Sequence, residues 1–150
     1  MKNILIIGAG KSSSSLIKFL IDKSDAENLR ILIGDLSTKN VTKIINNHQN
    51  AKAIVFDVFN EQQRETEIEK SDLVISMLPA RFHIEVAKSC IKFKKHLVTA
   101  SYISKEIKAL DKAAKENGLV FMNEIGLDPG LDHMSAMQIL GRIREKNAKM

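Results

Sequence analysis

The sequence Ile4-Leu-Ile-Ile-Gly-Ala-Gly-Lys-Ser-Ser13 joins a short apolar run to a glycine-rich turn near the start of the chain. The apolar run predicts a buried β-strand, and apolar residues at helical spacing from Leu16 to Ile21 predict a helix after the turn. Two of the three glycines of the G-x-G-x-x-G pattern are present, and the small residue Ser13 takes the third place. A strand, a glycine-rich turn and a helix in this order predict a dinucleotide-binding unit. The alternative is an ordinary tight turn between a strand and a helix.

The glycine turn has the chemistry that a pyrophosphate requires. Gly8 lets the strand turn sharply, and Gly10 lets the backbone come close to the phosphates. The helix that follows directs free N–H groups and the positive end of its dipole toward an anion. We therefore expect the whole turn to contact a cofactor, through Gly8, Ala9, Gly10, Lys11, Ser12 and Ser13.

Five further apolar runs alternate with amphipathic stretches along the chain. The runs are Arg30–Ile33, Ala53–Phe56, Leu73–Ser76, His96–Val98 and Leu119–Phe121. Short apolar runs separated by helices are typical of a parallel sheet that is covered on both faces. The sequence therefore predicts an α/β fold with a doubly wound parallel sheet of the Rossmann type. Before the last run, one continuous helix is expected from Ile103 to Ala114, ended by Asn117-Gly118.

The end of the sequence predicts a domain boundary. A last amphipathic stretch runs from Asp132 to Lys146, and its apolar side is formed by Ala136, Ile139, Leu140 and Ile143. No capping element follows this stretch before Met150. We expect residues 1–131 to form a dinucleotide-binding domain, and residues 132–150 to form a helix that leads into a substrate domain absent from this chain.

Two aspartates follow the second and third apolar runs. Asp35 lies 22 positions after Ser13, close to the roughly 20 positions expected for the acid that binds the adenosine ribose. A carboxylate there repels a 2′-phosphate and favours NAD over NADP, although Lys39 is a weak signal in the other direction. A helix N-cap is the alternative role. Asp57 is expected beside the adenine, with a loop or capping aspartate as an equal alternative.

Composition excludes several classes of protein. The chain has 150 residues, of which 44% are hydrophobic and 27% charged, and this suits one folded domain. The net charge of +5 comes mainly from scattered lysines, and aromatics are 5%, so no nucleic-acid partner is expected. No apolar run approaches the ~20 residues of a membrane span. The single cysteine, Cys90, suits a reducing cytoplasm.

The histidines give no metal-binding pattern. His48, His83 and His96 lack ligand spacing to one another, to a carboxylate or to Cys90. Cys90 falls on an apolar helix face and is expected to pack in the core, and Met134 and Met137 are expected to fill a helix face. No metal is therefore expected.

Four motifs, taken in order, resemble the saccharopine dehydrogenase family, the glutamate-forming saccharopine reductases. They are Gly8-Ala-Gly10, Ser76-Met-Leu-Pro79, Thr99-Ala-Ser-Tyr102 and Glu124-Ile-Gly-Leu-Asp-Pro-Gly-Leu-Asp-His133. The resemblance covers essentially the whole chain, and the last motif is the most specific. It implies a fragment of a two-domain oxidoreductase that converts saccharopine to glutamate and aminoadipate semialdehyde with NAD or NADP.

The resemblance also implies site residues. Cofactor contacts beyond the glycine turn are Asp35, Asp57, Val58, Ser76, Leu78, Ser101, Leu127 and Pro129. Substrate contacts are Ser101, Tyr102 and Asp128, and Asp128 is the catalytic candidate that orients the substrate amine or relays a proton. The sequence departs from the family twice, because Ser13 replaces a small apolar residue or glycine and Asp35 stands where NADP-using relatives often carry arginine. NAD is the expected cofactor, with NADP as the alternative.

Two other functions stay open on the sequence. A homospermidine or carboxynorspermidine synthase would use the same cofactor on a polyamine imine, and a non-catalytic nucleotide sensor would share the glycine turn and Asp35. A sensor has no use for Asp128-Pro-Gly130, so this segment favours an enzyme. The expected partner is a small amino-acid substrate, and a homodimer is an open alternative. The isolated chain is expected to bind a nucleotide without turnover.

Overall fold

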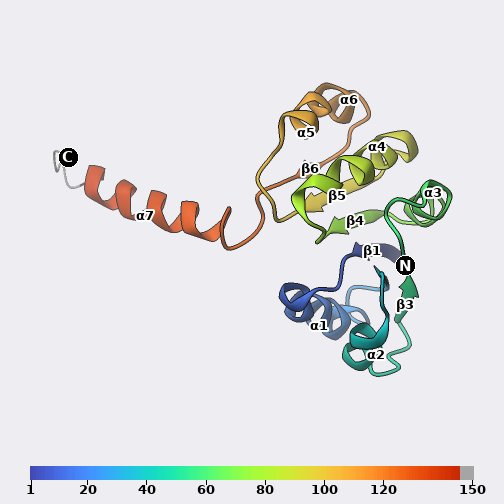
Figure 1. Ribbon diagram of the computed structural model, residues 1–150. Coiled ribbons are helices and arrows are strands. Elements are labelled where there is room, and N and C mark those ends of the chain that lie inside the picture. Colours follow the sequence, from blue (N-terminus) through green and yellow to red (C-terminus); the bar gives the residue numbers. More distant parts are fainter. Residues whose placement is uncertain (146–150) are drawn as a thin grey trace.

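The computed structural model describes residues 1–145 and contains one sheet of six parallel strands in the order β3-β2-β1-β4-β5-β6 (Figure 1). The strands are β1 (Lys2–Ile7), β2 (Leu29–Asp35), β3 (Ala51–Val55), β4 (Leu73–Ser76), β5 (His96–Thr99) and β6 (Phe121–Met122). The chain winds outward from β1 to β3 and then from β4 to β6, so the strand order reverses between β1 and β4. This arrangement confirms the doubly wound parallel sheet.

The described residues also form seven helices and two short 3₁₀ turns, of which all but the last helix lie between strands. The helices are α1 (Ser14–Lys23), α2 (Lys39–Ile45), α3 (Glu61–Glu69), α4 (His83–Phe93), α5 (Lys105–Ala109), α6 (Asp111–Glu116) and α7 (Leu131–Glu145), and the turns are η1 (Lys11–Ser13) and η2 (Ala80–Phe82). The pairing between strands is parallel throughout, and Ile7 of β1 lies opposite both Gly34 of β2 and Ser76 of β4.

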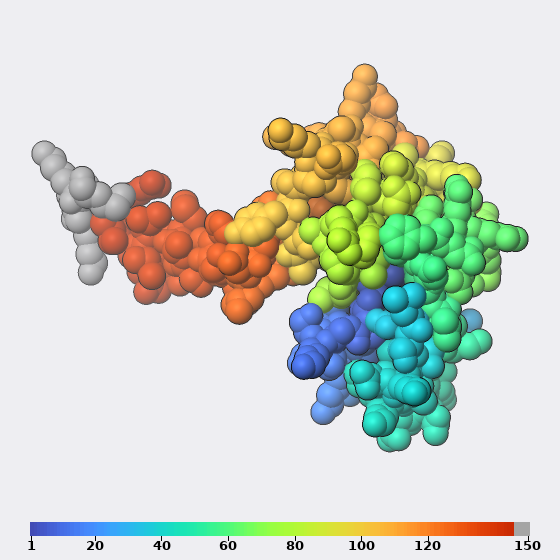
Figure 2. Space-filling view, viewed as in Figure 1, coloured from blue at the N-terminus to red at the C-terminus, as the bar shows by residue number. Residues whose placement is uncertain are grey.

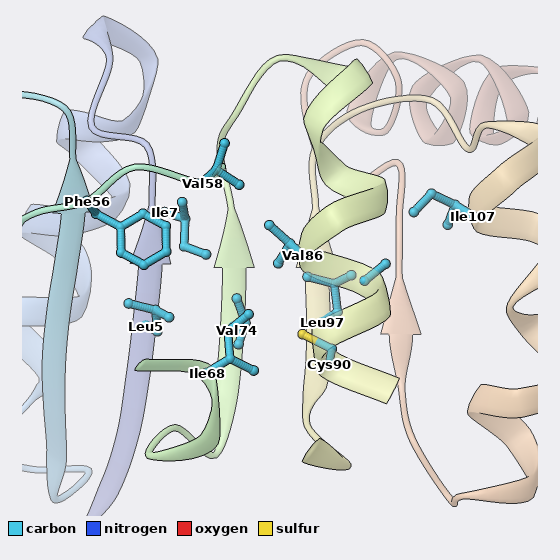
Figure 3. Close-up of a cluster of buried hydrophobic side chains, with 11 residues drawn as sticks. Leu5, Ile7, Phe56, Val58, Ile68, Val74, Val86, Cys90, Leu97 and Ile107 are labelled. Atoms are coloured by element: carbon cyan, nitrogen blue, oxygen red, sulfur yellow. The ribbon is translucent and has the colours of Figure 1, made fainter. Parts of the chain in front are cut away.

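The core has two parts because the sheet is buried on both faces. Along β1, Leu5 and Ile7 belong to one cluster of buried residues, while Ile4 and Ile6 belong to the other. Successive side chains of a strand point to opposite faces, so an apolar strand supplies both clusters. Figure 3 shows the first cluster, in which Cys90 of α4 is buried, as its position on an apolar face predicts.

The sequence did not indicate α3 as an amphipathic helix. Only Arg64 and Ile68 of this helix are buried, so Ile68 is its single buried apolar side chain. The helix begins where the Asn60 side chain accepts a hydrogen bond from the backbone N–H of Gln63 at 3.0 Å. Capping of this kind compensates for weak periodicity, because it satisfies a free donor of the first turn.

The helix expected from Ile103 to Ala114 is two helices instead of one. It breaks at Leu110, which ends α5 and precedes α6, and Ile103 lies outside both helices. The side chain of Ser104 caps α5 by accepting from Ile107 N at 3.2 Å, and this fixes the start of the helix after Ile103. Gly118, at φ +66°, follows α6 as expected. The strand after it begins at Phe121, two residues later than expected, because the N–H of Leu119 still bonds to the carbonyl of Ala114.

Helix α7 extends away from the rest of the molecule (Figures 1 and 2). None of its residues is buried, and Met134, Met137 and Ile139 are more than half exposed. The apolar side expected on this stretch therefore lies without a partner among residues 1–145. Lys146 and the rest of the expected segment 132–150 beyond Glu145 lie outside the described residues, and the domain boundary after residue 131 stays a prediction. None of the described helices is long and apolar enough to cross a lipid bilayer.

Candidate dinucleotide site

Two adjoining pockets open at the carboxyl ends of the strands, at the point where the strand order reverses. The glycine-turn pocket has a volume of about 370 Å³, and its wall includes Gly8, Gly10, Asp35, Asp57, Val58 and Leu78. The Ser-Tyr pocket has a volume of about 400 Å³, and its wall includes Ser12, Ser76, Leu78, Ser101, Tyr102, Asp128 and Pro129. Met77 and Leu78 line both pockets, so the two form one elongated site. Ligands of doubly wound sheets bind at this position.

Another hollow lies at the opposite edge of the sheet. It is lined by residues near the amino ends of strands, such as Asn3 of β1, Arg30 of β2 and Lys52 of β3. It contains none of the residues that the sequence predicts for a site. Parallel α/β sheets place their chemistry at the carboxyl ends of the strands, so this hollow is not part of the candidate site.

Gly8 is required by the path of the backbone. Its φ is +97°, and an added Cβ would lie 3.0 Å from the carbonyl carbon and oxygen of Met77. Its N–H donates to the carbonyl of Gly34 at 2.8 Å, which holds the turn against the end of β2. A side chain at this position would be both strained and in contact with the backbone. Gly8 therefore makes the sharp turn that the sequence predicts.

Gly10 is not required by the packing of the chain itself. Its φ of −66° suits any residue, and an added Cβ would meet nothing within 4 Å. The open space lies beside η1 and the start of α1, where backbone N–H groups and the positive end of a helix dipole are available. A bare glycine beside open space at a helix start fits a phosphate group that approaches the backbone.

The other residues of the turn have different surroundings. Lys11 and Ser12 are exposed, and Ser12 reaches the Ser-Tyr pocket. Ser13 is fully buried, and its hydroxyl donates to the carbonyl of Gly10 at 2.7 Å. Ala9 is almost buried and contributes its backbone N–H to Asp35. The hydroxyl of Ser13 and the backbone N–H of Ala9 therefore hold the turn in place.

Asp35 ends β2 and faces the glycine turn. Its Oδ2 accepts from the N–H of Ala9 at 2.6 Å, and its Oδ1 accepts from the N–H of Ser37 at 3.1 Å. The carboxylate is half-buried and lines the glycine-turn pocket, as does Asp57. It does not cap α2, for which Thr38 occupies the N-cap position. The alternative role of Asp35 as a helix cap is therefore wrong.

Asp57 and Val58 connect β3 to α3. Asp57 is exposed, and its Oδ1 accepts from the N–H of Phe59 at 2.9 Å, which is a local loop contact. The side chain of Val58 is buried in the core, and its carbonyl accepts from the buried guanidinium of Arg64. Arg64 also donates to Ser89 Oγ at 3.1 Å. Arg64 thus links Val58, in the wall of the glycine-turn pocket, to Ser89 of α4. The sequence around Arg64 gave no indication of this role.

A buried histidine joins the ends of two strands inside the site. His83 Nδ1 lies 2.8 Å from Ser76 Oγ, and His83 Nε2 lies 2.8 Å from Ser101 Oγ. Ser76 is fully buried and His83 is 3% exposed. Burial lowers the pKa of His83, so the imidazole is neutral at neutral pH. The sequence placed His83 correctly in the first turn of a helix but gave no signal for this role.

Tyr102 and Asp128 face each other at the mouth of the Ser-Tyr pocket. The phenol of Tyr102 donates to Asp128 Oδ1 at 2.6 Å, and both residues are exposed. This hydrogen bond to the carboxylate is the main reason that the pKa of Tyr102 is raised to about 12, so the phenol stays protonated at neutral pH. Pro129, after a cis peptide bond, is buried in the pocket wall. Leu127 is 75% exposed and lines neither pocket, so the structure does not bring it to the site.

The described part of the chain shows no cluster of histidine and acidic side chains of the kind that binds a metal ion. Within residues 1–145, no group of three or more His, Cys, Asp or Glu side chains is arranged to hold a metal ion.

Comparisons with known proteins show the family to which the chain is similar. The family model described as "Saccharopine dehydrogenase NADP binding domain" matches residues 4–122. Saccharopine dehydrogenase [NADP(+), L-glutamate-forming] of Pyricularia oryzae is 35% identical over 149 residues, which are 99% of this chain and 32% of that protein. The mitochondrial alpha-aminoadipic semialdehyde synthase of Rattus norvegicus is 35% identical over 98% of this chain and 16% of its own length.

Solved structures give the same result. Apo saccharopine dehydrogenase (L-Glu forming) from Saccharomyces cerevisiae aligns with a TM-score of 0.84 and 32% identity, over 97% of this chain and 32% of that one. Biliverdin reductase from Synechocystis shares the fold alone. It aligns with a TM-score of 0.67 and 20% identity, over 94% of this chain and 43% of that one. The chain spans about a third of the length of the fungal relatives. From the ordered motifs, the two joined pockets and these relatives, the chain belongs to the family of saccharopine dehydrogenase NADP-binding domains.

Proposed function

We propose that the chain binds the dinucleotide of a saccharopine dehydrogenase-like oxidoreductase along the two joined pockets. The observation that carries the proposal is the open space at Gly10, which lies next to the carboxyl ends of the strands and beside the start of a helix. The pyrophosphate would lie against this turn, the adenosine in the glycine-turn pocket and the nicotinamide in the Ser-Tyr pocket. Titration of the chain with NAD and NADP by calorimetry tests the proposal directly.

The proposed reaction oxidises the C–N bond of saccharopine. The bound dinucleotide supplies the hydride acceptor, and water then hydrolyses the resulting imine to glutamate and aminoadipate semialdehyde. The residues of this chain orient the reactants: Tyr102 and Asp128 at the mouth of the Ser-Tyr pocket would face the substrate amine. Asp128 accepts the phenol hydrogen bond on one oxygen and is exposed, so its other oxygen is available to a substrate N–H.

Saccharopine is the substrate we propose, in preference to a polyamine imine. Two relatives carry saccharopine dehydrogenase in their names, and the rat relative is a synthase of aminoadipic semialdehyde. The rat relative is also named as mitochondrial, so the cytoplasmic location expected for this chain stays a prediction. A homodimer likewise stays a prediction.

We further propose that this chain prefers NAD to NADP, although its fungal relatives are named for NADP(+). Among residues 1–145, the only charged side chains in the wall of the glycine-turn pocket are the carboxylates of Asp35 and Asp57. A 2′-phosphate placed there would meet negative charge and no cation, whereas a ribose hydroxyl can donate to Asp35. The competing signal from Lys39 is weak because this exposed side chain is not part of the pocket wall.

A further inference from the structure

The hydrogen bonds of His83 determine which way the Ser101 hydroxyl donates. A neutral imidazole has one N–H donor and one acceptor nitrogen, so only two arrangements of the three side chains exist. In the first, the Ser76 hydroxyl donates to Nδ1 and Nε2–H donates to Ser101 Oγ. In the second, Nδ1–H donates to Ser76 Oγ and the Ser101 hydroxyl donates to Nε2.

Burial separates these two arrangements. Ser76 is fully buried, and among residues 1–145 its hydroxyl has no side-chain partner other than His83. The second arrangement would leave the Ser76 hydroxyl proton buried without an acceptor, which is unfavourable because a buried donor has lost its hydrogen bond to water and gains none in return. The first gives the Ser76 hydroxyl proton an acceptor in Nδ1 and leaves no buried proton of the three side chains unpaired. Nε2 therefore carries the proton.

In this arrangement the Ser101 hydroxyl is left with a free proton. Ser101 Oγ already accepts from Nε2, and within the described chain it has no second side-chain partner. Ser101 is half-buried in the wall of the Ser-Tyr pocket, so the proton is available for donation toward the pocket. The Ser101 hydroxyl would therefore donate a hydrogen bond to a ligand in the Ser-Tyr pocket that has an oxygen acceptor beside it.

We propose that His83 is a positioning residue, which fixes Ser101 as a hydrogen-bond donor to the carboxamide oxygen at the nicotinamide end of the dinucleotide. This inference rests on the proposed function, because it takes the Ser-Tyr pocket as the nicotinamide side of the site. Ser101 makes the contact, and His83 acts through it. A carboxylate of the amino-acid substrate has the same acceptor chemistry, so the test has to separate the two sources.

The test compares NAD with ADP-ribose, which keeps the adenosine and the pyrophosphate but lacks nicotinamide. Affinities of both ligands are measured by calorimetry for the unmodified chain, His83→Gln and His83→Asn, with circular dichroism as the check on folding. Glutamine places an amide N–H near the position of Nε2, whereas asparagine places one near Nδ1. The two variants thus differ in which serine they reach.

We expect His83→Gln to keep the preference for NAD over ADP-ribose. His83→Asn should bind NAD about 2- to 10-fold more weakly, the range for one lost hydrogen bond, with its affinity for ADP-ribose unchanged. In a Ser101→Ala background, His83→Asn should cause no further loss. If His83→Asn fails to fold, Ser76→Ala takes its place, since it removes the donor that fixes the imidazole, and the same selective loss is expected.

Three results would overturn the inference. The first is an equal loss for NAD and ADP-ribose in His83→Asn, which would indicate a purely structural role. The second is unchanged NAD affinity in a folded His83→Asn or Ser76→Ala variant, which would leave a substrate carboxylate as the acceptor. The third is equal affinity of the unmodified chain for NAD and ADP-ribose. Failure of the unmodified chain to bind any of NAD, NADP and ADP-ribose would refute the proposed function itself.

Discussion

The carboxylate Oδ2 of Asp35 accepts a hydrogen bond from the backbone N–H of Ala9 at 2.6 Å, which ties the end of β2 to the glycine turn. The same side chain lines the pocket in which the adenosine is proposed to bind. Asp35 therefore has a structural contact through each oxygen, to Ala9 and to Ser37, and a position beside the proposed ligand. Its substitution is expected to change both stability and cofactor choice.

Asp35→Ala should narrow the preference for NAD over NADP, because it removes a negative charge from the place where a 2′-phosphate would lie. It should also lower the free energy of unfolding by about 1–3 kcal/mol, since the N–H of Ala9 loses its partner. Calorimetry with both cofactors and urea unfolding measure the two effects. Asp111→Ala, which removes an acid on the exposed α6, is the control for charge alone. Tighter binding of NADP than NAD to the unmodified chain would contradict the proposal.

Gly10→Val should abolish dinucleotide binding and leave the fold intact. An added Cβ meets nothing within 4 Å beyond its chain neighbours, so the valine side chain would extend into the open space proposed for the phosphates. Gly141→Val on α7 is the matched control, because its added Cβ also meets nothing and it lies far along the chain from the site. Circular dichroism and calorimetry are compared for the two variants. Normal binding by a folded Gly10→Val chain would show that Gly10 serves only the turn.

Tyr102 should titrate near pH 12, and Asp128→Ala should bring its pKa back toward 10, because alanine removes both the hydrogen bond to the carboxylate and its negative charge. The chain contains one tyrosine and no tryptophan, so ultraviolet absorbance reports Tyr102 alone. At pH 11 the unmodified chain should be largely phenol and the variant largely phenolate, with circular dichroism at the same pH as the folding check. A phenolate majority in the unmodified folded chain at pH 11 would disprove the Tyr102–Asp128 hydrogen bond in solution.

The stability of the chain should fall as the pH drops below about 6.5, partly because of His83. Its pKa is lowered in the folded state, so below the unfolded value of 6.5 the unfolded chain binds a proton that the folded chain does not. This contribution is at most about 1.4 kcal/mol per pH unit. Urea unfolding at pH 7.5 and 5.5 should show a larger loss for the unmodified chain than for His83→Gln. The pKa of Asp72, already lowered from 3.8, keeps that carboxylate outside this pH window. An equal loss of unfolding free energy in both chains would mean that the pKa of His83 is not lowered by folding, as expected for an imidazole in contact with water.

The chain by itself should bind a dinucleotide but should not oxidise saccharopine. Saccharopine has three carboxylates, and residues 99–132 contain no arginine to hold them. Without such contacts the reacting carbon is not held in position for hydride transfer, and most of the rate is lost. Absorbance at the wavelength of reduced nicotinamide, at high protein concentration with saccharopine and NAD, measures the rate. Appreciable turnover would show that the catalytic site is complete within these residues.

Much of the fold was predictable because its signals are local. The apolar run before Gly8 and the spacing to Asp35 indicated the βαβ order, since the burial of a parallel strand and the turn of its backbone depend on neighbouring residues. The same reasoning missed α3, whose buried face is only Arg64 and Ile68, and it did not find the break at Leu110. At α3 the polar cap Asn60 takes the place of hydrophobic periodicity, whereas at Leu110 the periodicity continues across a break that has no side-chain cap.

The sequence by itself determined the strands, the glycine turn and the family, because these depend on local patterns and on ordered motifs. Only the tertiary structure decided which polar side chains meet. Ser76 and Ser101 are 25 positions apart, and the parallel pairing of Ser76 with Thr99 brings the loop after β5 to His83. The same holds for Tyr102 and Asp128, which are 26 positions apart. These contacts depend on strand order and register, which hydrophobic spacing along one segment does not encode.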